Sequence, residues 1–189
     1  MTDERRMPDG LLDPEAIDML VVHCSDTPDD QPLRARGIQQ MHLGFGWDGI
    51  GYHQVICRDG TREAGRPEYW RGAHALGANE RSLSVCLIGR THFTDDQMHS
   101  LGTLLDDWRT RYPRAQIVGH RDAVETDKTC PNFDVGSWWI SRLDPARADQ
   151  LVVTVPTLAM TAAPGSPSLE TELLFGETVR VLERTDTHA

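Results

Sequence analysis

The fold is decided by one apolar run, Ile17-Asp18-Met19-Leu20-Val21-Val22-His23-Cys24, which ends at the turn-forming cluster Ser25-Asp26-Thr27-Pro28. A short apolar run bounded by turn residues is typical of a buried β-strand. Such a strand carries His23 near its carboxyl end. In α/β proteins the carboxyl ends of the strands collect functional side chains. The run therefore predicts a buried strand that delivers a histidine to a functional edge of a sheet.

Strand and helix patterns alternate along the chain after this first run. We expect strands at 51–58, 83–88 and 116–118, a further short strand after the tight turn 58–61, and helices at about 36–43, 95–112 and 135–143. The second helix is the most clearly marked. Thr94 and Gln97 have the spacing of a capping box, and an apolar stripe follows them at spacings of three and four up to Pro113. The alternation predicts an α/β domain over residues 16–143.

Composition and charge exclude several classes of protein. The sequence has 189 residues, of which 29 are acidic and 19 basic, for a net charge of −10. Nucleic acid is not an expected partner, because the chain lacks the dense Lys/Arg cluster of nucleic-acid binders. No stretch offers the roughly 20 apolar residues of a membrane helix. Residues 1–15 are predicted to be a mobile arm, and no secretory signal is visible in them.

Two histidines and one cysteine could share a metal ion. His23 and His120 both lie at predicted strand ends, and Cys130 follows ten residues after His120, within reach of the same ion. Catalytic zinc takes three protein ligands and keeps a fourth position for water. Spacing alone leaves open that each histidine is an ordinary surface or hydrogen-bonded residue. The other three cysteines lie in apolar runs and are expected to be buried free thiols.

A series of short motifs runs in one order over residues 17–140: Val21-Val22-His23-Cys24-Ser25, Gly51-Tyr52-His53, Arg58-Asp59-Gly60-Thr61, Gly72-Ala73-His74-Ala75, Asn79, 83–89, Gly119-His120-Arg121-Asp122 and Lys128-Thr129-Cys130-Pro131. This series resembles the zinc-dependent N-acetylmuramoyl-L-alanine amidases, a family that includes phage amidase-type lysozymes and peptidoglycan recognition proteins. The resemblance implies a mixed central β-sheet flanked by helices. It also implies one zinc ion per chain, bound by His23, His120 and Cys130.

The resemblance suggests roles for further side chains. Tyr52 and Lys128 match residues beside the metal, where a hydroxyl and an ammonium group could stabilise the oxyanion of amide hydrolysis. His74 and Asn79 match the block that lines the substrate groove, and the Arg71 guanidinium could pair with a stem-peptide carboxylate. For these last three residues a structural role in holding their loop is an equal alternative.

Two departures from the family pattern lie near the groove. Ser84 stands where the family usually has glycine, and Asn132 replaces the common glycine after Cys-Pro. His53 follows Tyr52 and must point to the opposite face of its strand, so we expect it to be packed rather than a metal ligand.

The composition changes beyond Asp144, and residues 144–189 are predicted to form a short β annex. Strands are expected at 152–156 and 177–182, separated by a turn-rich stretch at 162–168. The annex resembles the first part of a bacterial Src-homology-3-like barrel but has too few strands to close one. Whether it packs on the catalytic domain, exchanges between chains, stays loose or binds the cell wall is left open.

These observations predict an N-acetylmuramoyl-L-alanine amidase that hydrolyses the amide between N-acetylmuramic acid and L-alanine of peptidoglycan. The preferred biology is a monomeric phage or prophage endolysin, made in the cytoplasm and acting on the wall after crossing a membrane lesion. Three alternatives remain: a non-catalytic peptidoglycan-binding module, a cytoplasmic wall-recycling amidase, and a regulator that binds another protein. Cys130 and Tyr52 favour the enzyme, because non-catalytic members of the family characteristically lack the cysteine ligand.

Overall fold

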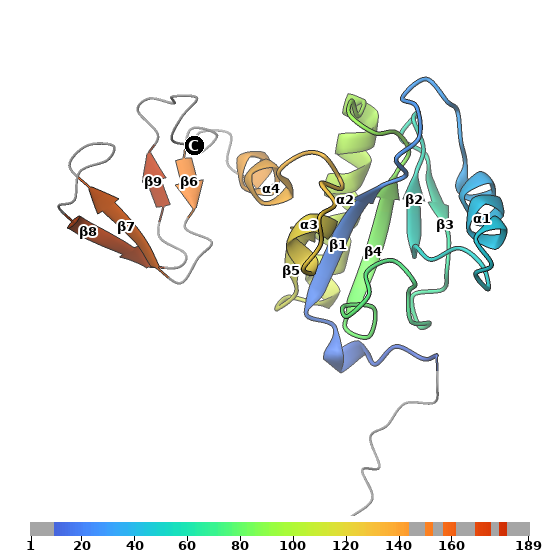
Figure 1. Cartoon of the computed structure of the whole chain (residues 1–189), viewed down its shortest axis with the longest axis horizontal. Coiled ribbons are helices and arrows are strands. Elements are labelled where there is room, and N and C mark those ends of the chain that lie inside the picture. Colours follow the sequence, from blue (N-terminus) through green and yellow to red (C-terminus); the bar gives the residue numbers. More distant parts are fainter. Residues whose placement is uncertain (1–9, 144–149, 153–156, 162–168, 175–177, 181–189) are drawn as a thin grey trace, which may run out of the picture. The chain divides into compact units, whose positions relative to one another are not determined.

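The computed structural model describes residues 10–143, 150–152, 157–161, 169–174 and 178–180 (Figure 1). The chain divides into two compact units after Gly136. The first unit contains a five-stranded sheet with its helices, and the second contains most of α4 (Val135–Leu143) and two small two-stranded sheets. Among the described helices, none has both the length and the apolar character needed to cross a membrane.

The sheet of the first unit is mixed, as predicted. Its strands lie in the order β3-β2-β4-β1-β5, with bounds β1 Met19–Cys24, β2 Gln54–Ile56, β3 Arg62–Ala64, β4 Ser82–Leu87 and β5 Gln116–Gly119. Strand β1 pairs in parallel with β4 and β5, and β2 pairs in parallel with β4. Only the pairing of β3 with β2, among these strands, is antiparallel. The parallel strands therefore present their carboxyl ends at one edge.

Strand β1 confirms the prediction made from the apolar run. All six of its residues are buried, because neighbouring strands flank it on both sides and both of its faces are covered. The strand begins at Met19, two residues later than expected, since a short 3-10 helix at Pro14–Ala16 precedes it. His23 is the penultimate residue, at the carboxyl edge.

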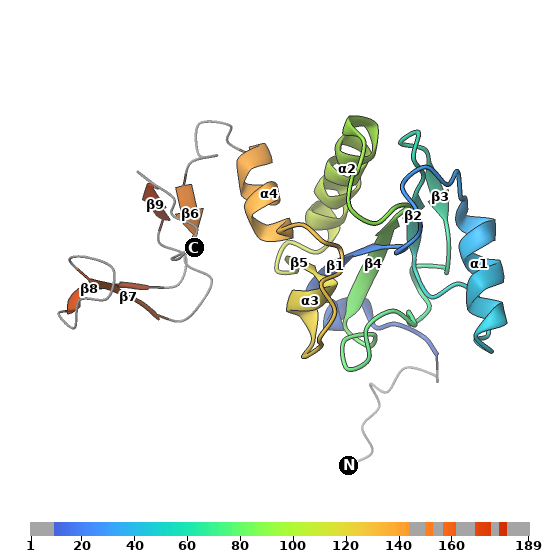
Figure 2. The same ribbon diagram turned by 45° about the horizontal axis from the view of Figure 1, so that its top comes forward.

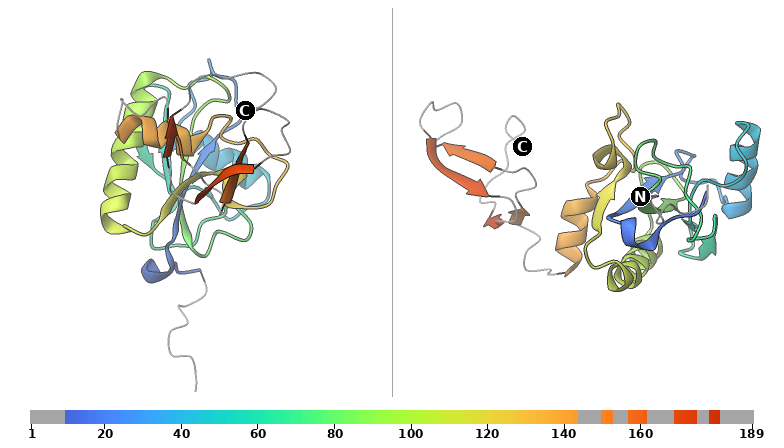
Figure 3. Two further views of the ribbon diagram at one scale, coloured as in Figure 1. Left: turned by 90° about the vertical axis from the view of Figure 1, so that its left-hand side faces the viewer. Right: turned by 90° about the horizontal axis from the view of Figure 1, so that it is seen from below.

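Helices cover both faces of this sheet. Figure 3, in one view from the side and one from below, places α1 (Ala35–Gly44) and α2 (Asp95–Arg111) on opposite sides of the strands, and Figure 2 shows α1 beside β2 and β3. Helix α2 begins with the predicted capping box: Thr94 Oγ1 accepts the N–H of Gln97, and Gln97 Oε1 accepts the N–H of Thr94, both at 3.1 Å. The buried Leu101, Leu105 and Trp108 follow on its inner face.

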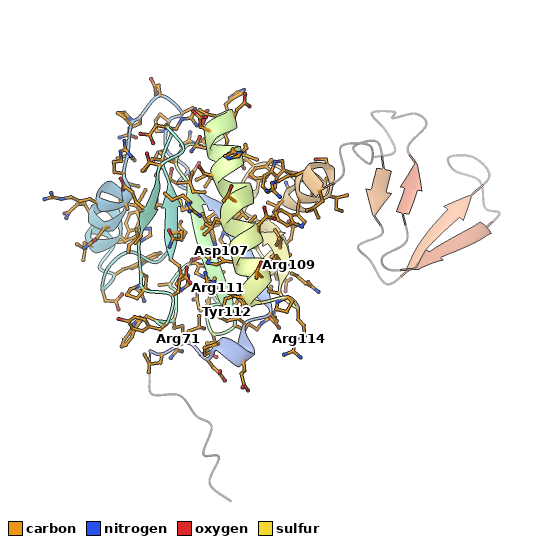
Figure 4. The ribbon with its side chains drawn as sticks, turned by 180° about the vertical axis from the view of Figure 1, so that it is seen from behind. Arg71, Asp107, Arg109, Arg111, Tyr112 and Arg114 are labelled. Carbon is orange, nitrogen blue, oxygen red and sulfur yellow. The ribbon has the colours of Figure 1, made fainter. Side chains whose placement is uncertain are left out.

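Arginines gather around the last turn of α2 and in a neighbouring loop (Figure 4). Glu68 joins this end of the helix to the loop, because one oxygen accepts the Trp108 indole N–H at 2.9 Å and the other pairs with Arg111 at 2.6 Å. Arg111 also pairs with Asp107, one turn earlier. Arg71 instead pairs with the exposed Glu80. Cations in the last turn also complement the helix dipole.

Three features of the first unit differ from expectation. The strand predicted at 51–58 is regular only over Gln54–Ile56, and the N–H of Gly51 donates to Nδ1 of His42 instead of to a strand. A four-residue helix, α3 (His120–Ala123), follows β5 and was not predicted. Within the predicted mobile arm, Leu12 is buried and its N–H donates to the Tyr69 carbonyl, so the arm packs from about residue 10; residues 1–9 lie outside the described part.

The second unit contains α4 as predicted and two antiparallel strand pairs. Strand β6 (Gln150–Val152) pairs with β9 (Thr178–Arg180), and β7 (Thr157–Thr161) pairs with β8 (Leu169–Leu174). Strand β9 falls within the predicted strand at 177–182. Residues 153–156 and the turn-rich stretch 162–168 lie outside the described residues. The likeness of this annex to a Src-homology-3-like barrel stays a prediction.

Candidate active site

The three predicted metal ligands meet at the carboxyl edge of the sheet. Val22 of β1 lies opposite Gly119, the last residue of β5. The residues that follow, His23 on β1 and His120 at the start of α3, are therefore side by side, with ring centroids 4.5 Å apart. The loop after α3 carries Cys130 to the same place. The ligand atoms of His23, His120 and Cys130 all lie within 4.8 Å of one another. Two imidazoles and a sulfur so arranged form a site that fits a metal ion.

Specific hydrogen bonds hold the cysteine loop against the sheet. The N–H of Arg121 donates to the Cys130 carbonyl at 3.0 Å, and the N–H of Cys24 donates to the Cys130 sulfur at 3.3 Å. Asn132 adopts a φ of 72°, and its side-chain amide donates to the Arg90 carbonyl at 2.8 Å. Asparagine tolerates this left-handed conformation better than most residues, which explains how it can replace glycine here.

The surroundings keep both histidines neutral, the form in which imidazole binds a metal. Burial lowers the pKa of His23 well below its usual value, and the nearby His74 and His120 act in the same direction. Burial also lowers the pKa of His120, with a further contribution from the positive charge of Lys128.

The Cys130 thiol lies beside a second sulfur. Cys24 Sγ is 3.8 Å from Cys130 Sγ. The hydrogen bond with Cys24, and then burial, raise the pKa of Cys130, and repulsion between two adjacent thiolates acts in the same direction. A divalent cation held by the three ligands would oppose this effect by stabilising the Cys130 thiolate.

A cavity of about 390 Å³ opens on the three ligands, and Trp47, Tyr52, His74, Asp127 and Lys128 contribute to its lining. The Tyr52 ring lies 5.1 Å from that of His23. Burial raises the pKa of Tyr52 well above its usual value, so the phenol stays a hydrogen-bond donor. Lys128 is exposed, and its positive charge lowers the pKa of both His23 and His120. The cavity therefore places two proton donors beside the cluster.

Comparison with known proteins assigns the family. The family model described as N-acetylmuramoyl-L-alanine amidase matches residues 13–133, which include every ligand and both donors. The chain belongs to the N-acetylmuramoyl-L-alanine amidase family. The predicted family, its mixed sheet and its class as an amide hydrolase are thereby confirmed.

Relatives of this amidase include phage endolysins. It is 41% identical over 133 residues to the endolysin of Escherichia phage T7, covering 66% of this chain and 87% of that protein. An N-acetylmuramoyl-L-alanine amidase from Clostridium intestinale superposes with a TM-score of 0.60 at 30% identity, covering 72% of this chain and 89% of that one. A Drosophila peptidoglycan recognition protein in complex with tracheal cytotoxin superposes with a TM-score of 0.59 at 25% identity. The match covers 69% of this chain and 84% of that one.

Two of the three residues expected to bind substrate lie outside the lining of the amidase cavity. Arg71 pairs with Glu80 at 2.6 Å, and Asn79 Oδ1 accepts the backbone N–H groups of His74 and Ala75, both at 2.9 Å. His74 does line the cavity, where its Nδ1 lies 3.0 Å from Nε2 of His23. Substrate binding by these residues stays a prediction.

Trp47 and Cys24 are among the residues of the amidase cavity that sequence reasoning missed. Trp47, whose side chain is partly exposed at the cavity, was hidden in a glycine-rich stretch, and Cys24 was expected only to be a buried thiol. The motif Trp-Asp-Gly at a helix end and a cysteine directly after a ligand histidine were the available signals. His53 is packed as expected: its ring bonds Ser84 Oγ and the Trp70 carbonyl, both at 3.0 Å. Ser84 thus provides a hydroxyl that bonds the His53 ring, which the family glycine could not provide.

Proposed function

We propose that this amidase binds one zinc ion through His23, His120 and Cys130 and hydrolyses the amide between N-acetylmuramic acid and L-alanine of peptidoglycan. The observation that carries the proposal is the convergence of three ligand atoms within 4.8 Å at a cavity that also holds Tyr52 and Lys128. Two neutral imidazoles and one thiolate fill three of zinc's four tetrahedral positions and leave one for water.

The bound zinc would supply a Lewis acid and lower the pKa of a coordinated water to about 7. The protein's own groups then act on the substrate. The Lys128 ammonium and the Tyr52 hydroxyl donate hydrogen bonds to the oxygen of the amide carbonyl as negative charge develops on it. Tyr52 is protonated at neutral pH, since burial raises its pKa above an ordinary value that is already near 10.

Substrate contacts beyond the reacting amide would come from the walls of the cavity. Trp47 offers an aromatic surface to the substrate. Its ring packs against that of His42, with the ring centroids 4.5 Å apart. His74 borders the same space, and Asn79 and Arg71 hold the loop that carries it. We propose that this loop meets the stem peptide, with peptidoglycan fragments as the ligand.

We further propose that the protein acts on the cell wall as a monomeric endolysin that lyses a host. Its similarity to phage endolysins over most of their length supports this biology. A wall-recycling amidase is the competing assignment. Activity on intact sacculi supports the endolysin, whereas activity confined to soluble anhydro-muropeptides supports recycling.

The decisive experiment measures zinc content and amide cleavage on the same protein. Purified chain should contain one zinc ion and release free stem peptide from a muropeptide. Cys130→Ala should lose both properties, and Cys57→Ala, which removes a buried thiol outside the cavity, should lose neither. Tight muropeptide binding without cleavage would instead identify a non-catalytic binding module.

A further inference from the structure

Both ring nitrogens of His74 are engaged in a chain of hydrogen bonds that begins at a metal ligand. His23 Nδ1 faces Cys130 Sγ at 3.9 Å, so this nitrogen is directed into the ligand cluster. The other nitrogen of His23, Nε2, lies 3.0 Å from Nδ1 of His74. Beyond it, His74 Nε2 lies 3.4 Å from Ser82 Oγ, and Ser82 donates to the Ala78 carbonyl at 2.7 Å.

The direction of these hydrogen bonds follows from the last one. Because the Ser82 hydroxyl donates to a carbonyl, which can only accept, Ser82 Oγ is left to accept from His74 Nε2–H. A neutral His74 then has its lone pair on Nδ1 and accepts the Nε2–H of His23. His23 therefore carries its proton on Nε2 and has an unprotonated Nδ1. That is the tautomer a cation at the ligand cluster requires.

We propose that His74 is a positioning residue for the metal centre, which accepts the Nε2–H of His23 and thereby holds Nδ1 of His23 unprotonated and aimed at the cation. This inference rests on the proposed function, because it needs a cation at the site. It differs from direct substrate contact, since a ring with both nitrogens occupied has no polar atom left for the stem peptide.

The loop around His74 is built to fix this ring. Asn79 Oδ1 accepts the N–H groups of His74 and Ala75 and closes the loop from within. A Cβ at Gly72 would lie 2.4 Å from Cδ2 of His74, so only glycine leaves room for the imidazole here. His74 is half-buried, and the His53 ring packs edge-on against it at 5.9 Å between centroids. The imidazole is therefore held in one orientation by its own loop.

The test compares zinc affinity in His74 variants by competition with a chromogenic chelator. His74→Ala should weaken zinc binding by about 10- to 100-fold, the usual loss when a partner of a ligating histidine is removed. His74→Asn keeps an acceptor oxygen near the position of Nδ1 and should recover most of that loss. Ser82→Ala should weaken zinc binding less than His74→Ala. His99→Ala, which removes an exposed imidazole from α2, should change nothing.

Two further readouts separate positioning from substrate contact. At saturating zinc, His74→Ala should lower kcat with little change in KM, whereas a substrate contact would raise KM. In zinc-loaded wild-type protein labelled with ¹⁵N, the ring-nitrogen shifts of His23 should report a single Nε2–H tautomer.

Unchanged zinc affinity in both His74→Ala and His74→Asn, or a change in KM alone, overturns this inference and leaves the proposed function intact. If His74→Ala does not fold, the inference is tested by the zinc affinities of His74→Asn and Ser82→Ala and by the tautomer of His23 in the wild-type protein. A wild-type chain that binds no zinc overturns both proposals.

Discussion

The sulfur atoms of Cys24 and Cys130 lie 3.8 Å apart, and the backbone N–H of Cys24 donates to the Cys130 sulfur. One of these residues is a candidate metal ligand, and the other directly follows a second candidate ligand, His23. The pair therefore links the chemical state of the metal site to the oxidation state of the protein.

We expect metal-stripped protein to form a Cys24–Cys130 disulfide when it is treated with glutathione disulfide. The two thiols lose two protons and two electrons, and glutathione disulfide is reduced to two molecules of glutathione. Zinc should protect the pair, because it occupies the Cys130 thiolate. Peptide mapping by mass spectrometry checks the linkage, and Cys24→Ala should prevent it. Recovery of four free thiols from oxidised, metal-stripped protein would contradict the expectation.

Lys128 is the only lysine in the sequence, since every other basic residue counted with it is arginine. An amine-acylating reagent should therefore modify Lys128 and the N-terminal amine alone. Loss of the ammonium charge should reduce kcat by about 100-fold or more while zinc stays bound, because one oxyanion donor is removed. Lys128→Arg, which retains only the N-terminal amine, is the control: acylation should leave its residual activity unchanged.

Tyr52→Phe should also lower kcat by about 100-fold, because it removes the second donor to the developing oxyanion. The phenyl ring preserves the packing against His23, so the zinc content and the thermal unfolding temperature should stay at wild-type values. Steady-state kinetics with a synthetic muropeptide measures the effect. Equal kcat in wild type and variant would remove Tyr52 from the mechanism.

His53 should make folding depend on pH. Burial lowers its pKa to about 4, whereas the unfolded chain has an ordinary histidine near 6.5. As pH falls below about 6.5, His53 binds a proton in the unfolded state, whereas in the folded state it stays neutral until about pH 4. Stability contributed by the neutral ring is therefore present above pH 6.5 and lost between about 6.5 and 4, by roughly 3 kcal/mol in all.

Urea unfolding over that range measures the dependence on pH. His53→Asn should give a shallower fall in the free energy of unfolding than wild type, even though its stability near pH 7 is lower. Because His23 and His120 contribute alike in both proteins, the difference between the two curves isolates His53. Parallel curves would show that His53 does not titrate in this way.

Glu68 should matter more for stability than an exposed carboxylate with a similar ion pair. Glu68→Ala leaves the indole N–H of the fully buried Trp108 without its acceptor, at a cost of about 1–3 kcal/mol. The Glu80 side chain is 78% exposed, so Glu80→Ala, which breaks its pair with Arg71, should cost less than about 1 kcal/mol. Chemical denaturation distinguishes the two variants, and equal losses would contradict the argument.

Local sequence patterns predicted the elements that depend on local chemistry. The apolar run at 17–24 predicted β1 with His23 at its end, and the spacing of Thr94 and Gln97 predicted the start of α2. Strand β2 is shorter than its pattern, because the N–H of Gly51 donates to the His42 ring and its carbonyl accepts the N–H of Ala73, so neither pairs with a strand.

The geometry around Cys130 could not be derived from spacing. Ten residues separate it from His120, but the loop's path depends on contacts with distant segments, such as the bond from Asn132 to the Arg90 carbonyl. The resemblance to the family predicted Cys130 as the third ligand, which its spacing from His120 alone could not establish. The chain of bonds from His23 through His74 to Ser82 joins residues 8 and 51 positions apart, and only the folded structure brings them together.

Strand β1 is hydrogen-bonded along both edges, whereas Cys130 belongs to a loop. The paired strands thus place the two imidazoles, at the end of β1 and directly after β5, whereas the sulfur lies on a loop that a few hydrogen bonds hold against the sheet. Exchange of the ion should therefore proceed by release of that loop, with the strands undisturbed. The same asymmetry lets the third donor be altered through evolution without rebuilding the sheet that holds the other two.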